Sequence, residues 1–357
     1  MSRPVRFAVI GSGWRSEFFL RLAAAAPERL EPVGVLARRA EAREQLGRRW
    51  GVRTVETIAE LLALQPEYVI AAVSWEAMPE VTRELVAAGV KVLAETPPAP
   101  DLDGLRSLWS DVGASGLVQV AEQYTLMPGH AARLAVARRG VIGAPSAVQI
   151  SSTHLYHAVS LMRAFLGAST EEVVVNARHF EAPLADPLTP AGWVEHPEPI
   201  QRGTTIATID FGGGRMGLYD FVDNQWWNPL LSRRIVVRGS LGEIHDDAVT
   251  RLTADGPVTS TITYRRTGID LNLEGNDVVN ATFDGEVVYR NPWVGTRLSE
   301  DDIAVASLLE DTGSWARDEG PAPYPLADGC QDHAVGIAIG ESARTGADVR
   351  VAADLWR

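Results

Sequence analysis

The densest group of chemically active side chains lies in residues 151–157, which read Ser-Ser-Thr-His-Leu-Tyr-His. His154 and His157 are three residues apart, so one helical turn would place both imidazoles on the same side. An imidazole exchanges a proton near neutral pH because its ordinary pKa is about 6.5. The spacing therefore indicates a centre for acid–base chemistry.

The same segment admits other interpretations. Either histidine could be a hydrogen-bonded polar residue at the start of a helix. Two imidazoles could also ligate zinc, but no third ligand is apparent nearby, so we expect no metal. Thr153 can only donate or accept a hydrogen bond and is a candidate substrate contact.

Two other segments carry side chains that could reach this centre. Glu122-Gln123-Tyr124 follows a strand pattern, and the Tyr124 hydroxyl could donate a proton if its ordinary pKa of about 10 were lowered. Tyr124 could equally be a packing residue at a domain boundary. Residues 223–228 hold two tryptophans flanked by amides, a composition that suits a sugar; Gln225 and Trp226 are candidate substrate contacts. An oligomer interface is the alternative, because tryptophan is enriched there.

A glycine-rich turn, Gly11-Ser12-Gly13, follows an apolar run and precedes a helical pattern. This is the context of the dinucleotide fingerprint, in which the first glycine permits a tight turn and the second lets the backbone approach a pyrophosphate at a helix N-terminus. Ser16 replaces the third glycine, so the match is partial. We expect a bound dinucleotide here; an ordinary tight turn is the alternative.

The end of the second expected strand bears on the choice of dinucleotide. It has no carboxylate that could hold the ribose 2′-hydroxyl of NAD, but it has Arg38 and Arg39. Guanidinium groups bind phosphate well, so we predict NADP in preference to NAD. Alternatively, both arginines are solvated residues at a helix start, which is common in so arginine-rich a chain.

The elements around these residues suggest two domains and an α/β fold. Strand patterns at 5–10, 30–36, 68–73 and 90–95 alternate with helical patterns, which indicates a parallel Rossmann sheet in a dinucleotide-binding domain at 1–124. After about residue 125 the strand patterns follow one another in series, and 125–357 is expected to be an α/β domain with an open, largely antiparallel sheet and flanking helices. The proline-rich stretch 181–201 reads as a long loop. The polar clusters Asn272–Glu274 and Asp332-His333 are expected on solvated surface.

Composition narrows the class of protein. The 357 residues carry a net charge of −13, which argues against a nucleic-acid binder. A single cysteine, Cys330, excludes a disulfide framework and suits a reducing compartment. No targeting or membrane segment is visible, so we expect a soluble cytoplasmic protein with no membrane partner.

Six runs of residues match the pattern of a known family, in the same order and over nearly the full length; they are 11–14, 88–97, 139–143, 157–167, 236–242 and 341–346. They resemble the Gfo/Idh/MocA oxidoreductases, the family of glucose–fructose oxidoreductase and inositol dehydrogenase. The resemblance implies a Rossmann domain followed by an α/β domain with an open sheet, a nicotinamide cofactor, and a sugar or polyol substrate. It also implies a homodimer or homotetramer formed through the open sheet.

The chain departs from the family pattern at several positions: Val73-Ser74-Trp75 replaces the usual Thr-Pro-Asn, Met78 replaces a histidine, and two further departures bear directly on the chemistry. The family usually has Glu-Lys-Pro, whose lysine helps to polarise or deprotonate the reacting oxygen; here Thr96 stands in the lysine position. A family Asp and His, four residues apart, correspond to Thr153 and His157. His157 is therefore expected to act as acid or base, and His154 to replace the lysine as polarising donor. Lys91, the single lysine among 33 basic residues, is expected on the far side of the sheet.

The fingerprint and the resemblance together give the candidate cofactor contacts, which are Gly11, Ser12, Gly13, Trp14, Arg15, Arg38, Arg39, Ser74, Trp75, Glu95, Thr96 and Gln123.

We therefore expect an NAD(P)-dependent oxidoreductase that acts by hydride transfer on a sugar-like or cyclitol-like alcohol or carbonyl, with a proton relay built on His157, His154 and Tyr124. Two alternatives stay open. One is a cofactor-binding sensor or scaffold without dehydrogenase turnover. The other is a lyase or hydrolase that uses a tightly bound nicotinamide for transient oxidation.

Overall fold

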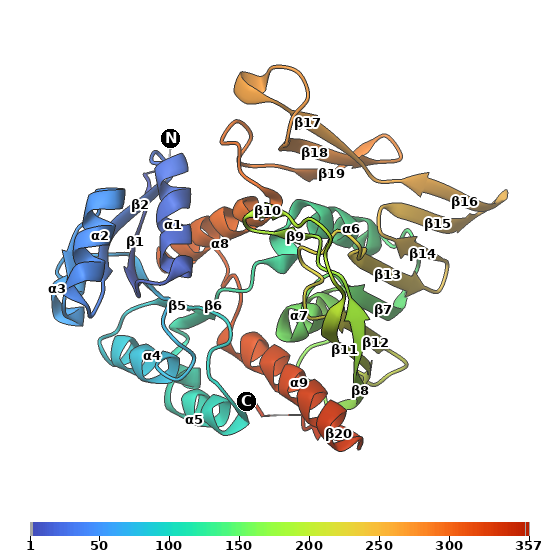
Figure 1. Cartoon of the computed structure of the whole chain (residues 1–357), viewed down its shortest axis with the longest axis horizontal. Helices are drawn as coiled ribbons and strands as arrows, with labels where there is room; N and C mark the ends of the chain where they lie inside the picture. The colour runs from blue at the N-terminus through green and yellow to red at the C-terminus, as the bar shows by residue number, and fades with distance from the viewer. Residues whose placement is uncertain (1–2, 354, 357) are drawn as a thin grey trace.

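The computed structural model describes residues 3–353 and 355–356, and two large sheets dominate it (Figure 1). The first is a six-stranded sheet in the order β3-β2-β1-β4-β5-β6, and all its strand pairs are parallel. The strand order reverses between β1 and β4, and ligands bind at the carboxyl ends of strands at such a switch point. Its strands are β1 Val5–Ile10, β2 Leu30–Leu36, β3 Thr54–Val55, β4 Tyr68–Ala71, β5 Val92–Ala94 and β6 Val118–Val120.

Helices cover the first sheet, which explains why β1 and β4 are almost continuously apolar. Local sequence sets their ends: Thr57 and Glu60 form a capping box at the start of α3, and Gly51 ends α2 with a φ of 65°. These helices are α1 Trp14–Ala25, α2 Ala40–Trp50, α3 Ile58–Leu62, α4 Met78–Ala87 and α5 Leu102–Val112, and the short 3₁₀ turn η1 Gly113–Ser115 follows α5.

The second sheet has nine strands in the order β16-β15-β14-β13-β7-β12-β11-β8-β20. Only its β7–β12 pair is parallel, so the expectation of a largely antiparallel sheet is confirmed. The strands are β7 Pro145–Ser151, β8 Val173–Leu184, β11 Ile200–Asp210, β12 Met216–Val222, β13 Arg234–Gly239, β14 Gly242–His245, β15 Ala248–Thr253, β16 Gly256–Thr261 and β20 Val349–Val351.

Smaller elements complete this half of the chain. The helices α6 Pro128–Arg138 and α7 Leu155–Leu166 flank β7, and the 3₁₀ turn η2 Tyr124–Leu126 joins the two halves. One face of the large sheet exposes Phe180, Ile206 and Met216, and this is the face through which the resemblance implies self-association. Two smaller sheets are also present. One pairs β9 Leu188–Thr189 with β10 Gly192–Trp193. The other contains β17 Thr263–Thr267, β18 Asp277–Phe283 and β19 Glu286–Arg290, and the 3₁₀ turn η3 Ile269–Leu271 follows β17.

The expectation of a long loop over 181–201 is wrong. Strand β8 continues to Leu184 and β11 begins at Ile200, so the two pair from Ile200↔Leu184 to Asp210↔Val174. The short strands β9 and β10 occupy much of the connection between them. The hydrogen bonds between β8 and β11 keep this part of the chain extended. The prolines that suggested a loop lie at the end of β8 and in the connection to β11.

Two long helices bring the end of the chain back to its beginning. Helix α8 Glu300–Ala316 lies beside the first sheet, where the Tyr68 hydroxyl donates to the Leu309 carbonyl at 3.0 Å. Helix α9 Leu326–Thr345 packs against α7 and β8 (Figure 1). None of the described helices combines the length and apolarity that a membrane crossing requires.

Helix α9 also corrects one surface expectation. Asp332 and His333 are only 2% and 7% exposed, because this part of α9 is packed into the second domain. The Arg163 guanidinium pairs with Asp332 at 2.7 Å, which supplies the partner that a buried carboxyl group needs. The other cluster, Asn272–Glu274, is exposed as expected.

Candidate functional site

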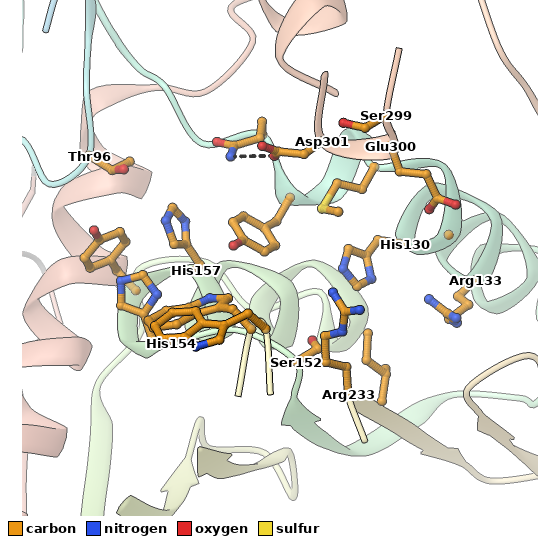
Figure 2. A pocket seen from close by; sticks show the side chains of 18 of the residues that line it. Thr96, His130, Arg133, Ser152, His154, His157, Arg233, Ser299, Glu300 and Asp301 are labelled. Atoms are coloured by element: carbon orange, nitrogen blue, oxygen red, sulfur yellow. Dashed lines mark hydrogen bonds between the residues drawn. The ribbon is translucent and has the colours of Figure 1, made fainter. Parts of the chain in front are cut away.

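A cavity of about 1110 Å³ opens between the carboxyl ends of the parallel strands and the second half of the chain. Single-ligand pockets usually measure roughly 300–1,000 Å³, so this cavity has room for a cofactor end and a second small molecule. Thr96, His157 and His154 lie at one side of it, and Arg133, Arg233 and Glu300 lie at the other (Figure 2).

The glycine turn fits a dinucleotide. Gly11 has a φ of 137°, and a Cβ there would collide with the Ala72 carbonyl oxygen, so the turn requires glycine. At Gly13 a Cβ would meet nothing within 4 Å, which leaves the approach to α1 open. No side chain caps the N-terminus of α1, so its free N–H groups can bind a pyrophosphate. Ser16, at the third fingerprint position, is buried beneath Gly11.

The two arginines that follow β2 remain available to a ligand. Arg38 and Arg39 are exposed at the carboxyl end of this strand. Arg43 instead serves the fold, because its guanidinium donates to the carbonyls of Ala37 and Arg38 at 2.9 Å each. The carboxyl end of β2, where Arg38 and Arg39 lie, is the position at which a Rossmann enzyme contacts the ribose of its dinucleotide.

A buried carboxylate–histidine pair lies at one end of the cavity, where His157 lines the wall and Glu122 lies behind it. His157 Nδ1 is 2.5 Å from Glu122 Oε2, and the two residues are 7% and 3% exposed. The other carboxylate oxygen accepts the backbone N–H of Tyr124 at 3.1 Å. Because a carboxylate only accepts, it holds the proton on Nδ1 and leaves the Nε2 lone pair for the cavity. His157 can therefore accept a proton there.

Sequence reasoning singled out His157 but not its partner. Glu122 lies in the loop after β6 and His157 in the first turn of α7, 35 residues apart. No local pattern links the two positions. The one available signal is that Glu122 follows a parallel strand at its carboxyl end, where functional side chains gather.

Aromatic rings surround His157. The ring centroids of Tyr124 and Tyr156 each lie 4.4 Å from the imidazole, and that of His154 lies 5.1 Å from it. Trp226 packs against His154 at 4.8 Å. The structure therefore brings both predicted histidines, Tyr124 and Trp226 together at one end of the cavity.

Burial sets the protonation of these neighbours. Burial and the nearby His157 lower the pKa of His154 to about 3, so His154 is a neutral hydrogen-bonding group. Burial raises the pKa of Tyr124 to about 12, away from neutrality, and it raises the pKa of Tyr156 as well. Both phenols therefore stay protonated and act as hydrogen-bond donors.

The predicted contacts divide into two groups. Gln225 does not line the cavity: its amide donates to the carbonyls of Ser151 and Ser232 at 2.7 and 2.8 Å, and so fixes the turn that carries Trp226. Thr153 is fully buried, and Ser12 and Ser74 also lie outside the cavity lining. The predicted residues that line the cavity are Trp14, Arg15, Trp75, Glu95, Thr96, Gln123, Tyr124, His154, His157 and Trp226.

Two charged residues near the cofactor end are already paired. Arg15 Nε lies 2.6 Å from Glu95 Oε1, which joins the glycine turn to the loop after β5. The single lysine lies away from the cavity. Lys91 stands just before β5, at the amino end of that parallel strand, and its Nζ contacts Asp318 at 2.6 Å. In the part of the chain that the structure describes, no group of three or more acidic, cysteine or histidine side chains could hold a metal ion.

Two buried histidines give the fold a defined acid sensitivity. Burial lowers the pKa of His130 to about 3 and that of His333 to about 4, whereas each takes up a proton near pH 6.5 in the unfolded chain. The unfolded state therefore binds more protons below pH 6.5, and stability falls as the pH drops. Burial raises the pKa of Asp332 to about 6. As the pH falls, Asp332 therefore takes up its proton in the folded state before it does so in the unfolded state, and this partly offsets the loss of stability.

We expect the free energy of unfolding to be lower at pH 5 than at pH 7. His130, His333 and His154, whose pKa is likewise lowered to about 3, each lower it by about 2 kcal/mol at pH 5, and Asp332 offsets about 1 kcal/mol of the sum. Urea unfolding at the two pH values, followed by circular dichroism, measures the difference. The explanation would be contradicted by a protein as stable at pH 5 as at pH 7, or by a His333→Gln variant with undiminished pH dependence.

Comparison with known proteins agrees with this architecture. Residues 5–122 match the family model GFO_IDH_MocA, described as "Oxidoreductase family, NAD-binding Rossmann fold". No curated protein matches the chain by sequence.

Solved structures of similar fold cover nearly the whole chain. An NAD binding oxidoreductase from Klebsiella pneumoniae is 16% identical with a TM-score of 0.70, covering 99% of this chain and 100% of its own. A myo-inositol dehydrogenase from Corynebacterium glutamicum is 17% identical with a TM-score of 0.66, covering 98% and 99%. A levoglucosan dehydrogenase in complex with NADH and levoglucosan is 17% identical with a TM-score of 0.68, covering 98% and 100%. Residues 5–122 thus match the Gfo/Idh/MocA oxidoreductase family with its NAD-binding Rossmann fold, and the whole chain shares the fold of these solved structures.

Proposed function

We propose that the protein is an NADP-preferring dehydrogenase or reductase that transfers hydride between the nicotinamide and an alcohol or carbonyl carbon of a sugar-like or cyclitol-like molecule. The observation that carries the proposal is the buried Glu122–His157 pair, of which His157 lines the cavity beside the loops after β5 and β6. Proteins of similar fold include dehydrogenases of myo-inositol and levoglucosan, which supports this substrate class.

The bound nicotinamide would supply the acceptor or donor of a hydride ion. In alcohol oxidation, the C–H bond of the substrate breaks to give the hydride, and His157 Nε2 takes the hydroxyl proton, so the products are a carbonyl compound, the reduced cofactor and an imidazolium. Glu122 Oε2 accepts from Nδ1–H and stabilises that imidazolium. In the reverse direction His157 returns the proton to the carbonyl oxygen.

Neutral donors complete the proposed site. Tyr124 keeps its hydroxyl proton at neutral pH and lies against His157, so it can hydrogen-bond the reacting oxygen. His154, neutral and beside Trp226, is placed to hold a second hydroxyl of the substrate. Thr96 presents a hydroxyl on the same side of the cavity (Figure 2). The proton transfer therefore rests on His157 without a lysine.

Cofactor preference is tested with the arginines beyond β2. We expect NADPH to bind more tightly than NADH, because Arg38 and Arg39 are available to the 2′-phosphate. The double variant Arg38→Ala/Arg39→Ala should lose roughly tenfold or more in NADPH affinity and little in NADH affinity. Fluorescence titration of the reduced cofactors measures both.

The matched control is Arg48→Ala, which removes an exposed arginine near the other end of α2. It should leave both affinities unchanged. Tighter binding of NADH than of NADPH by the unaltered protein would contradict the NADP preference. Cofactor binding without absorbance change across a broad panel of sugars and cyclitols would contradict the dehydrogenase function and favour a sensor or scaffold.

A further inference from the structure

The side of the cavity away from Thr96 and His157 is rich in arginine. Three of the arginines in the cavity lining are each paired with a carboxylate of the lining. These pairs are Arg15–Glu95, Arg133–Asp247 and Arg266–Glu300, with N–O distances of 2.6, 2.8 and 2.7 Å. Arg233, which also lines the cavity, pairs with no carboxylate among the residues described.

The remaining acidic side chains of the lining have donors of their own. Asp246 accepts the backbone N–H of Ile235 at 2.9 Å, and Asp301 accepts from the Gln123 amide at 3.2 Å. Neither carboxylate forms an ion pair with Arg233. Arg233 is exposed and lines the cavity, so its guanidinium is free to hydrogen-bond a ligand there.

Strand register places a hydroxyl opposite this guanidinium. Ser151 pairs with Arg234 at the ends of β7 and β13, so the next positions along the two chains, Ser152 and Arg233, face one another in the same antiparallel register. Both residues line the cavity, and both lie on the same side of it (Figure 2). Two segments 81 positions apart thus bring a cation and a hydroxyl to the same side of the cavity.

Buried polar atoms at this side of the cavity lack partners. Ser152 Oγ and His130 Nδ1 are buried without a hydrogen bond within the described part of the chain. His130 is only 8% exposed and lines the same cavity. A buried polar atom without a partner is costly, so such atoms at a cavity surface point to a ligand that satisfies them.

We propose that the substrate carries an anionic group, a carboxylate or a phosphate, which Arg233 binds with its planar guanidinium and which Ser152 and His130 hydrogen-bond. The proposal rests on the proposed function, because the rest of the substrate must then reach His157 for hydride transfer. It narrows the substrate from neutral sugars and cyclitols to sugar acids or sugar phosphates. The planar fork of arginine suits the paired oxygens of either group.

Calorimetric titration of the protein saturated with reduced cofactor tests this inference without requiring turnover. The probes are D-glucuronate, D-glucose 6-phosphate and D-glucose at matched ionic strength. We expect one of the two anions to bind at least tenfold more tightly than glucose, as a charge-assisted contact implies. The anion that binds more tightly distinguishes a carboxylate from a phosphate site.

Variants at Arg233 test the inference, and a variant at Arg238 of β13 provides the matched control. Arg233→Ala should abolish the preference for the anion, and Arg233→Lys should retain part of it because the charge stays while the fork is lost. Arg238→Ala removes an arginine of β13, the strand that follows Arg233; its side chain is 65% exposed and lies outside the cavity lining, so this change should have no effect. Cofactor fluorescence in the same samples reports whether each variant still folds and binds its dinucleotide.

The outcomes separate this inference from the proposed function. Glucose binding as tightly as both anions, failure of both anions to bind, or an Arg233→Ala variant with an unchanged preference would each overturn the anionic subsite while leaving the dehydrogenase intact. An arginine-dependent preference in a protein that reduces no sugar and oxidises none would support the subsite and contradict the dehydrogenase function.

Discussion

Replacing His157 by alanine is expected to lower the rate of hydride transfer by about 10²–10⁴-fold, the usual contribution of a general base. The variant loses the imidazole that takes the hydroxyl proton while the C–H bond breaks. Its affinity for the reduced cofactor should not change, because the dinucleotide is expected at the glycine turn and α1, whereas His157 belongs to α7. Stopped-flow absorbance of the reduced nicotinamide, at saturating substrate and cofactor, measures the rate.

Two further variants make this result specific. His157→Gln keeps more of the buried volume and should show the same loss, which separates lost chemistry from a packing defect. His179→Ala removes an exposed histidine of β8 and should leave the rate unchanged. A His157→Ala protein that folds, binds cofactor and transfers hydride at the normal rate would refute the role of His157.

Replacing Glu122 by glutamine is expected to lower kcat by roughly 10²–10⁴-fold with little change in KM. The amide has nearly the same shape but no charge, so it neither fixes the Nδ1–H tautomer nor stabilises the imidazolium. Glu122 acts through His157 and is therefore a positioning residue. Steady-state kinetics on the best substrate of the panel separate kcat from KM.

A partly buried carboxylate elsewhere supplies the control for Glu122. Glu67 pairs with Arg317 at 2.9 Å and is far from the cavity lining, so Glu67→Gln removes a comparable charge without touching the site. Its effect should appear in stability and not in kcat. Glu122→Asp, which keeps the charge, should recover part of the lost rate. A Glu122→Gln enzyme with altered KM and normal kcat would contradict the assigned role.

Local sequence was sufficient for the first sheet and its cofactor turn. Each strand and helix there is a short run with its own start and stop residues, and Gly11 and Gly13 act within a single turn. The antiparallel character of the second sheet was also predictable, from the series of strand patterns. The 181–201 connection was not, because a long-range ladder with β11 decides the path of β8.

The candidate site was predictable one residue at a time but not as a set. His157 stands out by type and position, yet its carboxylate partner Glu122 comes from the loop of another strand. Ser152 and Arg233 line the same cavity only because β7 and β13 are neighbours, which no pattern in either segment indicates. The burial of Asp332 likewise depends on the contacts of α9, which sequence periodicity does not give.

The central claim is that Glu122 and His157 act as one unit in moving the substrate proton. A double-mutant cycle on the rate of nicotinamide reduction tests it most directly, with the unaltered protein, Glu122→Gln, His157→Ala and the double variant. If the two residues act together, Glu122→Gln slows the unaltered protein strongly but slows the His157→Ala protein by less than about twofold. Equal slowing in both backgrounds would show that the two residues act independently and would contradict the account.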